Sequence, residues 1–287
     1  MLYLNNNFQI LDKLIPTRYD KQIDFGGSTK PWTVFAIKDS EIGQNPTELP
    51  YVVKLFSPTI VEQHPCIAKE FICNLLATEF DLFVPTMGII NLHTPEFLKT
   101  LKRKERDILK QRYDGNTFAS RLLTGALVTE SSKDLSENIQ DRAMIYAFDC
   151  FIYNIDRWGV HKKANLMLFE EQFILIDHEL SLPFIDGHNK STLDLIFKNV
   201  ENETIIYPYK NHLFYNSLRD YAGNKMVIFN TFHEYLNSLN VVRLRALLSE
   251  LQNNSIYVGE YEMLFEYIRG IKSRSAKFCE ALLSTIL

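Results

Sequence analysis

The sequence predicts an α+β protein in which a strand-rich part precedes a mostly helical part. In the first third of the chain, short apolar runs are separated by Gly, Pro and Asn, a pattern typical of strands joined by turns. From residue 131 onward, apolar residues recur at helical spacing, and a single hairpin pattern interrupts them. We expect a ligand cleft between two such parts.

Apolar runs bounded by turn residues predict the strands of the first part. They cover residues 33–37, 51–56, 87–92 and the beginning of 117–128. A helix is expected over residues 66–80, because Ile67, Phe71 and Leu75 share one helical face. The charged segment 95–112 predicts another helix.

The second part begins with a predicted helix and a hairpin. The helix covers residues 138–154, and a polar loop follows it up to residue 163. The hairpin has strands at 165–169 and 173–177, joined by a turn at 170–172. The remaining chain predicts helices at 225–239, 241–252 and 260–286.

Composition excludes several classes of protein. The chain has 287 residues and is 46% apolar, which is enough for a sizeable core. A net charge of −4 argues against a nucleic-acid or anionic-membrane surface. The four cysteines form no C-x-x-C pair, which argues against a zinc knuckle. We expect a cytoplasmic protein, because no signal-peptide pattern and no apolar run of about 18 residues is present.

The strongest candidate site lies between Asp156 and Asp177. Asp156 lies in the polar loop that follows a predicted helix, Asn165 begins the hairpin, and Asp177 ends it. Because the two ends of a tight hairpin are neighbours, we expect these oxygen-bearing side chains to converge. Such a set suits Mg²⁺, and phosphoryl transfer requires a metal and a carboxylate that orients the attacking hydroxyl. The alternative is a surface ion pair between Asp156 and Arg157, with Asp177 as a turn residue.

A lysine on a predicted strand supplies a second candidate. In kinases, such a lysine contacts the phosphates and pairs with a glutamate on the next helix. We prefer Lys54, because the helix that carries Glu70 follows it directly. Lys38 is the alternative lysine and Glu79 the alternative glutamate. The small residues Gly26, Gly27 and Ser28 precede a strand, where backbone N–H groups can approach a phosphate, although an ordinary loop also explains them.

Taken in order, these pieces resemble the HipA-like kinases, in particular their short single-chain branch, from about Leu11 to the C-terminus. The matching pieces are residues 26–28, 51–54, 69–77, 82–85, 117–125, 147–157, 165–168 and 175–179. The resemblance implies a two-lobed, protein-kinase-like fold with a strand-rich N-lobe and a mainly helical C-lobe. We place these lobes at residues 1–124 and 125–287.

The resemblance also implies a role for each candidate residue. Asp156 would be the catalytic aspartate, Asn165 and Asp177 would hold Mg²⁺, and Lys54 with Glu70 would form the phosphate-side ion pair. The loop with Gly26, Gly27 and Ser28 would cover the phosphates of ATP, and Leu122, Leu123 and Thr124 would face adenine.

Three features depart from ordinary protein kinases. Asn165 follows Asp156 by nine residues instead of five, and Asp177-His178-Glu179 replaces D-F-G. The phosphate loop has only two glycines.

The implied activity is ATP- and Mg²⁺-dependent phosphorylation of Ser or Thr in a protein substrate. Family members often act as toxins paired with an antitoxin protein, and Ser28 is the position expected for autophosphorylation. We expect no direct nucleic-acid or membrane partner. Two alternatives stay open: a small-molecule kinase of similar fold, and a nucleotide-binding pseudokinase that acts as an interaction module.

Overall fold

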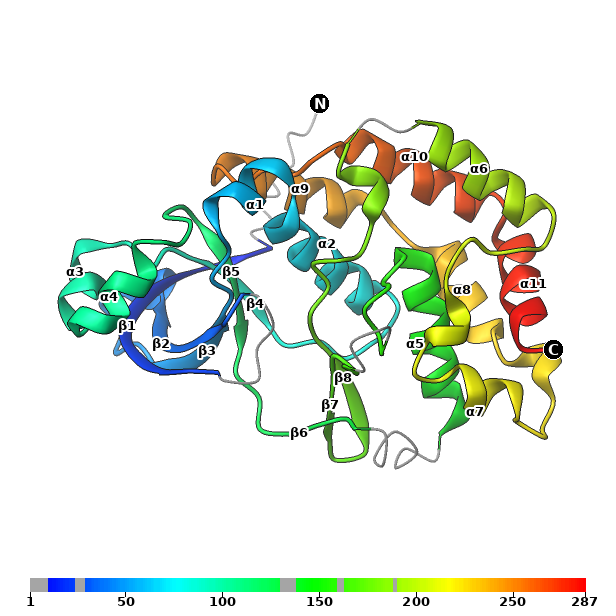
Figure 1. Cartoon of the computed structure of the whole chain (residues 1–287), viewed down its shortest axis with the longest axis horizontal. Coiled ribbons are helices and arrows are strands. Elements are labelled where there is room, and N and C mark those ends of the chain that lie inside the picture. The colour runs from blue at the N-terminus through cyan, green and yellow to red at the C-terminus, as the bar shows by residue number, and fades with distance from the viewer. Residues whose placement is uncertain (1–9, 24–28, 130–137, 159–162, 188–189) are drawn as a thin grey trace. The chain divides into compact units, whose positions relative to one another are not determined.

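The computed structural model describes residues 10–23, 29–129, 138–158, 163–187 and 190–287 (Figure 1). Strands dominate the first part of the chain and helices the rest, as the sequence predicts. Contacts divide the described residues into two compact units. The barrel unit takes its residues from Met1–Ile72, Thr86–Leu123 and Val242–Val258, and the helical unit from Cys73–Pro85, Thr124–Val241 and Gly259–Leu287.

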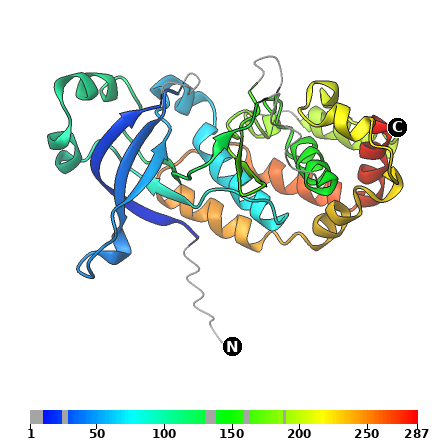
Figure 2. The same cartoon turned by 90° about the horizontal axis from the view of Figure 1, so that it is seen from below.

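Five strands of the barrel unit form a closed barrel in the order β1-β2-β3-β5-β4. They are β1 (Asp12–Gln22), β2 (Trp32–Lys38), β3 (Leu49–Val53), β4 (Met87–Ile90) and β5 (Thr117–Arg121). Neighbouring strands are antiparallel, except that β1 and β4 pair in parallel and thereby close the barrel. Figure 2 shows β1 and β2 curving side by side. The sequence did not predict this closure.

Strand β1 is the main element that the sequence pattern missed. Its sequence contains Pro16 and many charged residues, which weaken a strand pattern. The pairing with β2 tolerates them because the register shifts between Pro16 and Arg18 and again between Tyr19 and Lys21. The predicted strand 51–56 is also shorter in the structure, since its pairing with β5 ends at Val53.

The barrel interior is apolar. Alternate residues of β2, namely Trp32, Val34 and Ala36, are fully buried and pack with Val53 and Ala119 in one core cluster. This period of two is what a strand with one buried face requires.

The helices of this unit are short, apart from α2 and α9. Their bounds are α1 (Pro58–Gln63), α2 (Cys66–Glu79), α3 (Pro95–Thr100), α4 (Arg103–Leu109) and α9 (Val242–Asn253), with a 3₁₀ turn at Asp39–Glu41. The division between the units falls within α2, after Ile72. The predicted helix 95–112 is two helices, because the chain is extended at the buried Leu101.

The sequence predicts a single boundary after residue 124, and two segments of the structure fall on the other side of it. Residues 73–85 belong to the helical unit, and the segment with α9 belongs to the barrel unit. Hydrogen bonds tie α9 and the residue that follows it to distant segments of the barrel unit. The backbone N–H of Ile10 donates to the Glu250 carboxylate over 3.0 Å, and the Asn116 amide donates to the Asn254 carbonyl over 2.9 Å.

The described residues of the helical unit form a small sheet and six further helices. The sheet has the order β6-β7-β8, with β6 (Ala126–Leu127), β7 (Leu166–Phe169) and β8 (Gln172–Leu175). The helices are α5 (Ile139–Ile152), α6 (Lys190–Glu201), α7 (Tyr215–Arg219), α8 (Asn230–Ser238), α10 (Tyr261–Lys272) and α11 (Ser275–Ile286), and 3₁₀ turns occur at Pro183–Ile185, Tyr209–Asn211 and Lys225–Val227. The predicted helix 260–286 is thus two helices. Among the described residues, no helix combines the length and the apolar character needed to cross a membrane.

Aromatic side chains fill the core of the helical unit. Phe80 stacks on Phe232 at 4.9 Å between ring centroids and also contacts Phe148 and Phe151 of α5. Helix α5 is therefore held by an apolar core, and a loop leads from its C-terminal end towards the β7–β8 hairpin (Figure 1).

The hairpin turn is tighter than the predicted turn at residues 170–172. Phe169 pairs with Gln172, so only Glu170 and Glu171 form the turn. Both have positive φ angles, 47° and 66°. A two-residue turn of this kind matches the right-handed twist of the strands, although glutamate rarely occupies it.

The parallel closure of the barrel generates a testable prediction at Gly88. A Cβ atom on Gly88 would lie 2.9 Å from the Asp12 carbonyl oxygen and 2.8 Å from the Leu14 side chain. Because a backbone carbonyl cannot move away without breaking the β1–β4 pairing, we expect Gly88→Ala to destabilise the protein by about 1–3 kcal/mol. Urea unfolding measures this change.

Gly187→Ala is the matched control, since nothing lies within 4 Å of a Cβ atom at Gly187. It should change stability by less than about 0.5 kcal/mol. Equal stability of Gly88→Ala and wild type would show that the closure tolerates a side chain.

Candidate active site

Lys54 and Glu70 form a buried ion pair within the barrel unit. Lys54 follows β3 directly, and Glu70 lies in the first half of α2. The ammonium of Lys54 donates to the Glu70 carboxylate, and the two side chains are only 11% and 2% exposed. The predicted pairing is confirmed, and a contact with phosphate stays a prediction. The alternative lysine, Lys38, instead pairs with Asp12 at 2.8 Å near the surface of the barrel.

The residues predicted to face adenine follow strand β5. The backbone N–H of Leu122 donates to the Pro50 carbonyl over 2.9 Å, and the chain passes from the barrel unit to the helical unit after Leu123. Thr124 is exposed. The predicted phosphate-loop residues Gly26, Gly27 and Ser28 lie outside the described residues.

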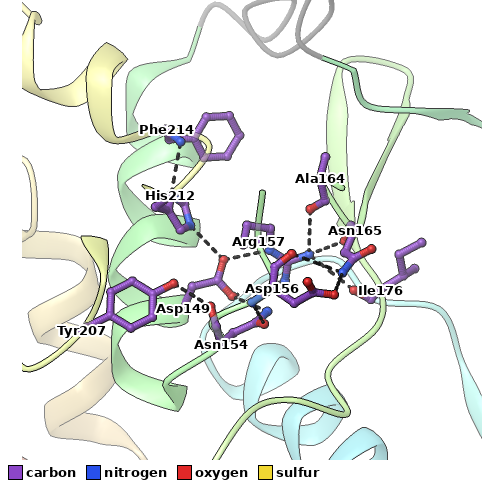
Figure 3. Close-up of polar contacts among 10 residues, drawn as sticks. All are labelled: Asp149, Asn154, Asp156, Arg157, Ala164, Asn165, Ile176, Tyr207, His212 and Phe214. Carbon is purple, nitrogen blue, oxygen red and sulfur yellow. Dashed lines mark hydrogen bonds and ion pairs between the residues drawn. The ribbon is translucent and has the colours of Figure 1, made fainter. Parts of the chain in front are cut away.

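Asp156 and Asn165 come together in the helical unit (Figure 3). The Asn165 amide nitrogen donates to Asp156 Oδ2 over 2.8 Å. The nine-residue separation does not prevent this contact. A β-bridge brings Trp158 and Lys163 together, and in it the Trp158 N–H donates to the Lys163 carbonyl over 2.7 Å. The departure from the spacing of ordinary protein kinases therefore leaves Asn165 in contact with Asp156.

The contact with Asp156 also fixes the orientation of the Asn165 amide. An amide nitrogen, not the oxygen, must face a carboxylate, so Asn165 Oδ1 points away from Asp156. Within the described part of the chain, no hydrogen bond reaches this oxygen. Asn165 also has a left-handed backbone with φ of 47°, which asparagine tolerates better than most residues.

Asp177 follows the second strand of the same hairpin. The Ile176 N–H donates to the Asn165 carbonyl over 3.2 Å, so Asp177 lies one residue beyond a backbone contact with Asn165. Asp177 also has a left-handed φ of 63°. Its carboxylate lies within 4.8 Å of that of Glu179. This second carboxylate, which we did not predict as a site residue, adds an oxygen donor beside Asp177.

Asp149 of helix α5 anchors this region. It is fully buried, and its carboxylate accepts hydrogen bonds from three side chains (Figure 3). The donors are Asn154 Nδ2 at 2.9 Å, Arg157 Nε at 2.8 Å and Nη2 at 3.2 Å, and His212 Nε2 at 3.0 Å. Burial by itself would raise the pKa of Asp149, but the Arg157 guanidinium and His212 hold that pKa below its usual range.

Arg157 therefore pairs with Asp149 inside the molecule, and the alternative of a surface ion pair with Asp156 is wrong. The Asp149 carboxylate receives four hydrogen bonds, which is what its two oxygens can accept. Asn154 extends the network, since its oxygen accepts from the Asp156 N–H over 3.2 Å. Tyr207 donates to the Asn154 carbonyl over 2.5 Å.

His212 has a defined tautomer in this network. Its Nδ1 accepts from the Phe214 N–H over 3.1 Å, so the proton is on Nε2, which donates to Asp149. Burial lowers the pKa of His212, although the hydrogen bond to Asp149 opposes this effect. The imidazole is thus neutral at neutral pH.

Sequence reasoning assigned no role to Asp149 or His212. A signal was present for Asp149, because it is the one acidic residue in the apolar run Ala147–Ile152 of a helix and is costly to bury alone. No local pattern marks His212, which lies 63 residues further along the chain.

The neutral, buried state of His212 predicts a pH dependence of stability. The unfolded chain takes up a proton near pH 6.5, whereas folded His212, with its lowered pKa, does so only at lower pH. The free energy of unfolding should therefore fall as the pH drops through 6.5. We expect His212→Gln, which retains an N–H donor and does not titrate, to show a shallower fall. Urea unfolding between pH 8 and 5.5 measures both slopes.

The control is His64→Gln at an exposed histidine, which leaves the buried network intact. His93, whose pKa burial also lowers, contributes a slope that both variants retain. Wild-type and His212→Gln profiles that run parallel over this pH range would contradict the assignment.

Comparisons with known proteins bear on the activity. A model of the HipA-like kinase family matches residues 44–220, which is more than half of the chain. The crystal structure of the Helicobacter pylori proinflammatory kinase CtkA is similar at 13% sequence identity and a TM-score of 0.48, with 95% of each chain covered. The comparison with curated proteins found no match. The extent of the family match shows that this chain belongs to the HipA-like kinase family.

Proposed function

We propose that this protein is an ATP- and Mg²⁺-dependent phosphotransferase that phosphorylates Ser or Thr hydroxyls of a protein. The observation that carries the proposal is the hydrogen bond from Asn165 to Asp156 at the end of the hairpin that leads into Asp177. Membership of the HipA-like kinase family supports it. The proposal includes a protein-kinase-like fold, with the barrel unit as N-lobe and the helical unit as C-lobe.

The side chains of the helical unit fit a magnesium ion. Asn165 Oδ1 carries no hydrogen bond within the described residues, and the carboxylates of Asp177 and Glu179 are close together. All are hard oxygen donors, the type that Mg²⁺ prefers. Asn165 and Asp177 would hold the ion. When bound, Mg²⁺ neutralises the phosphate oxygens of ATP.

Asp156 is suited to orient the attacking hydroxyl. Its Oδ2 is occupied by the Asn165 amide, so within the described residues Oδ1 is left to accept from a hydroxyl group. The side-chain oxygen of Asn154 accepts a hydrogen bond from the backbone N–H of Asp156, and this bond limits the movement of Asp156. Catalysis of this kind depends on placement more than on strong acid–base chemistry.

Lys54 would bind the phosphates, and Glu70 would hold Lys54 in place. The pair is nearly inaccessible to water. A charge–charge contact in such a buried place is stronger than one on the surface. We retain Leu122, Leu123 and Thr124 as the proposed contacts to adenine, and Gly26, Gly27 and Ser28 as the proposed cover of the phosphates.

The first prediction of this proposal is that the protein binds a nucleotide. A ligand at 100 times its dissociation constant stabilises a protein by about 2.7 kcal/mol, so saturating ATP with Mg²⁺ should raise the Tm by on the order of 5 °C. ATP without Mg²⁺ should give a much smaller shift. Differential scanning calorimetry with and without the metal tests this. The absence of any shift at millimolar ATP would count against the proposal.

Phosphate transfer is the second prediction. Asp177→Asn removes a metal-binding charge while keeping the size of the side chain, so we expect transfer from γ-labelled ATP to fall by at least about 100-fold. Asp194→Asn, the same substitution at an exposed residue of α6, is the control and should keep wild-type activity. A fully active Asp177→Asn protein would refute the metal-binding assignment.

The acceptor distinguishes the remaining possibilities. Labelled phosphoserine or phosphothreonine in a protein supports the proposed substrate, whereas label on an alcohol-bearing metabolite indicates a small-molecule kinase. Binding of ATP without any transfer indicates a pseudokinase. An antitoxin partner and a cytoplasmic location stay predictions from the sequence.

A further inference from the structure

Arg157 makes contacts beyond its ion pair with Asp149. The residue is 1% exposed, and only its Nε and Nη2 atoms face the carboxylate. Its Nη1 atom donates instead to backbone carbonyl oxygens of two other segments (Figure 3). The acceptors are Ala164 and Ile176, both at 3.3 Å, and Asn165.

These carbonyls belong to the segments that carry the candidate site residues. The Asn165 carbonyl is part of the residue whose amide holds Asp156. The Ile176 carbonyl is in the peptide bond that leads into Asp177. Arg157 itself follows Asp156 directly in the chain. The guanidinium group of Arg157 therefore binds the backbone at Asn165 and just before Asp177, and the backbone of Arg157 adjoins Asp156.

The chemistry requires arginine at this position. A guanidinium is planar and presents five N–H donors in fixed directions, so it can bind a carboxylate with one edge and carbonyls with the other. A lysine ammonium can keep the charge but cannot fill both sets of contacts. Because Asp149 is itself held by Asn154 and His212, the edge that faces the hairpin has a fixed direction.

We propose that Arg157 is a positioning residue for phosphoryl transfer: it transmits the fixed position of helix α5 to the backbone at Asn165 and Ile176. The metal-binding side chains then keep their geometry before metal and nucleotide arrive. This inference rests on the proposed function and adds to it a residue that contacts neither substrate nor metal.

Metal affinity provides the test. Mn²⁺ binding is measured by titration calorimetry in the presence of a non-hydrolysable ATP analogue, for wild type and for Arg157→Lys. Loss of a group that orients metal ligands typically lowers metal affinity by about 10–100-fold. We expect Arg157→Lys to bind Mn²⁺ at least 10-fold more weakly than wild type. We also expect this variant to unfold cooperatively, which shows that it is folded.

A control separates positioning from stability. Tyr267 donates to the Phe151 carbonyl over 2.5 Å in the core of the same unit, and it is not a hydrogen-bond partner of Arg157 among the described residues. Tyr267→Phe loses one buried hydrogen bond, so it should lower the Tm and leave Mn²⁺ affinity unchanged. Equal losses of affinity in Tyr267→Phe and Arg157→Lys would overturn the proposal.

A second variant covers the case in which Arg157→Lys does not fold. The double variant Asp149→Asn with Arg157→Met leaves no buried charge unpaired and keeps an acceptor for His212. It should fold and bind Mn²⁺ at least 10-fold more weakly than wild type. If neither variant folds, the pair serves stability and the positioning role is wrong.

The outcomes also distinguish this inference from the proposed function. A wild-type protein that binds no Mn²⁺ with the nucleotide analogue would refute the proposed function. A wild type that binds, with folded Arg157 variants that bind equally tightly, would refute only the positioning role.

Discussion

The buried ion pair between Asp149 and Arg157 is the interaction on which the candidate site depends. A charged group without a partner is costly inside a protein, so neither residue is tolerated there without the other. The four hydrogen bonds to Asp149 and the carbonyl contacts of Arg157 meet this requirement. As a result, the end of α5, the loop with Asp156 and the residues that flank the two hairpin strands share one polar network.

Among the described residues, a buried ion pair of the barrel unit and one of the helical unit differ in their proposed roles. In the barrel unit, Lys54 is itself the candidate phosphate-binding residue, and Glu70 is its partner. Asp149 and Arg157 support candidates in the helical unit and are proposed to touch no ligand. Asn165 and Asp177, which both have positive φ angles, lie at or next to the carbonyls that Arg157 binds.

Much of the fold and part of the site followed from the sequence. Periodicity predicted β2, α2, α5 and the hairpin, and the order of elements selected Lys54 and Glu70 as partners. Periodicity failed at β1, because Pro16 and charged residues hide a strand whose irregular pairing is decided by its neighbour β2. It also failed at residues 95–112 and 260–286, where local pattern does not reveal a break between two helices.

The sequence by itself determined the α+β class, the family and the identity of the candidate residues. Hydrophobic spacing and short motifs are local properties, and they can be read along the chain. Only the tertiary structure decided that the barrel closes through β1 and β4, that α9 belongs with the barrel unit, and that Asp149 is the partner of Arg157 and His212. These contacts join residues far apart in sequence, and the choice of partner for a buried charge depends on which groups folding brings within hydrogen-bond distance.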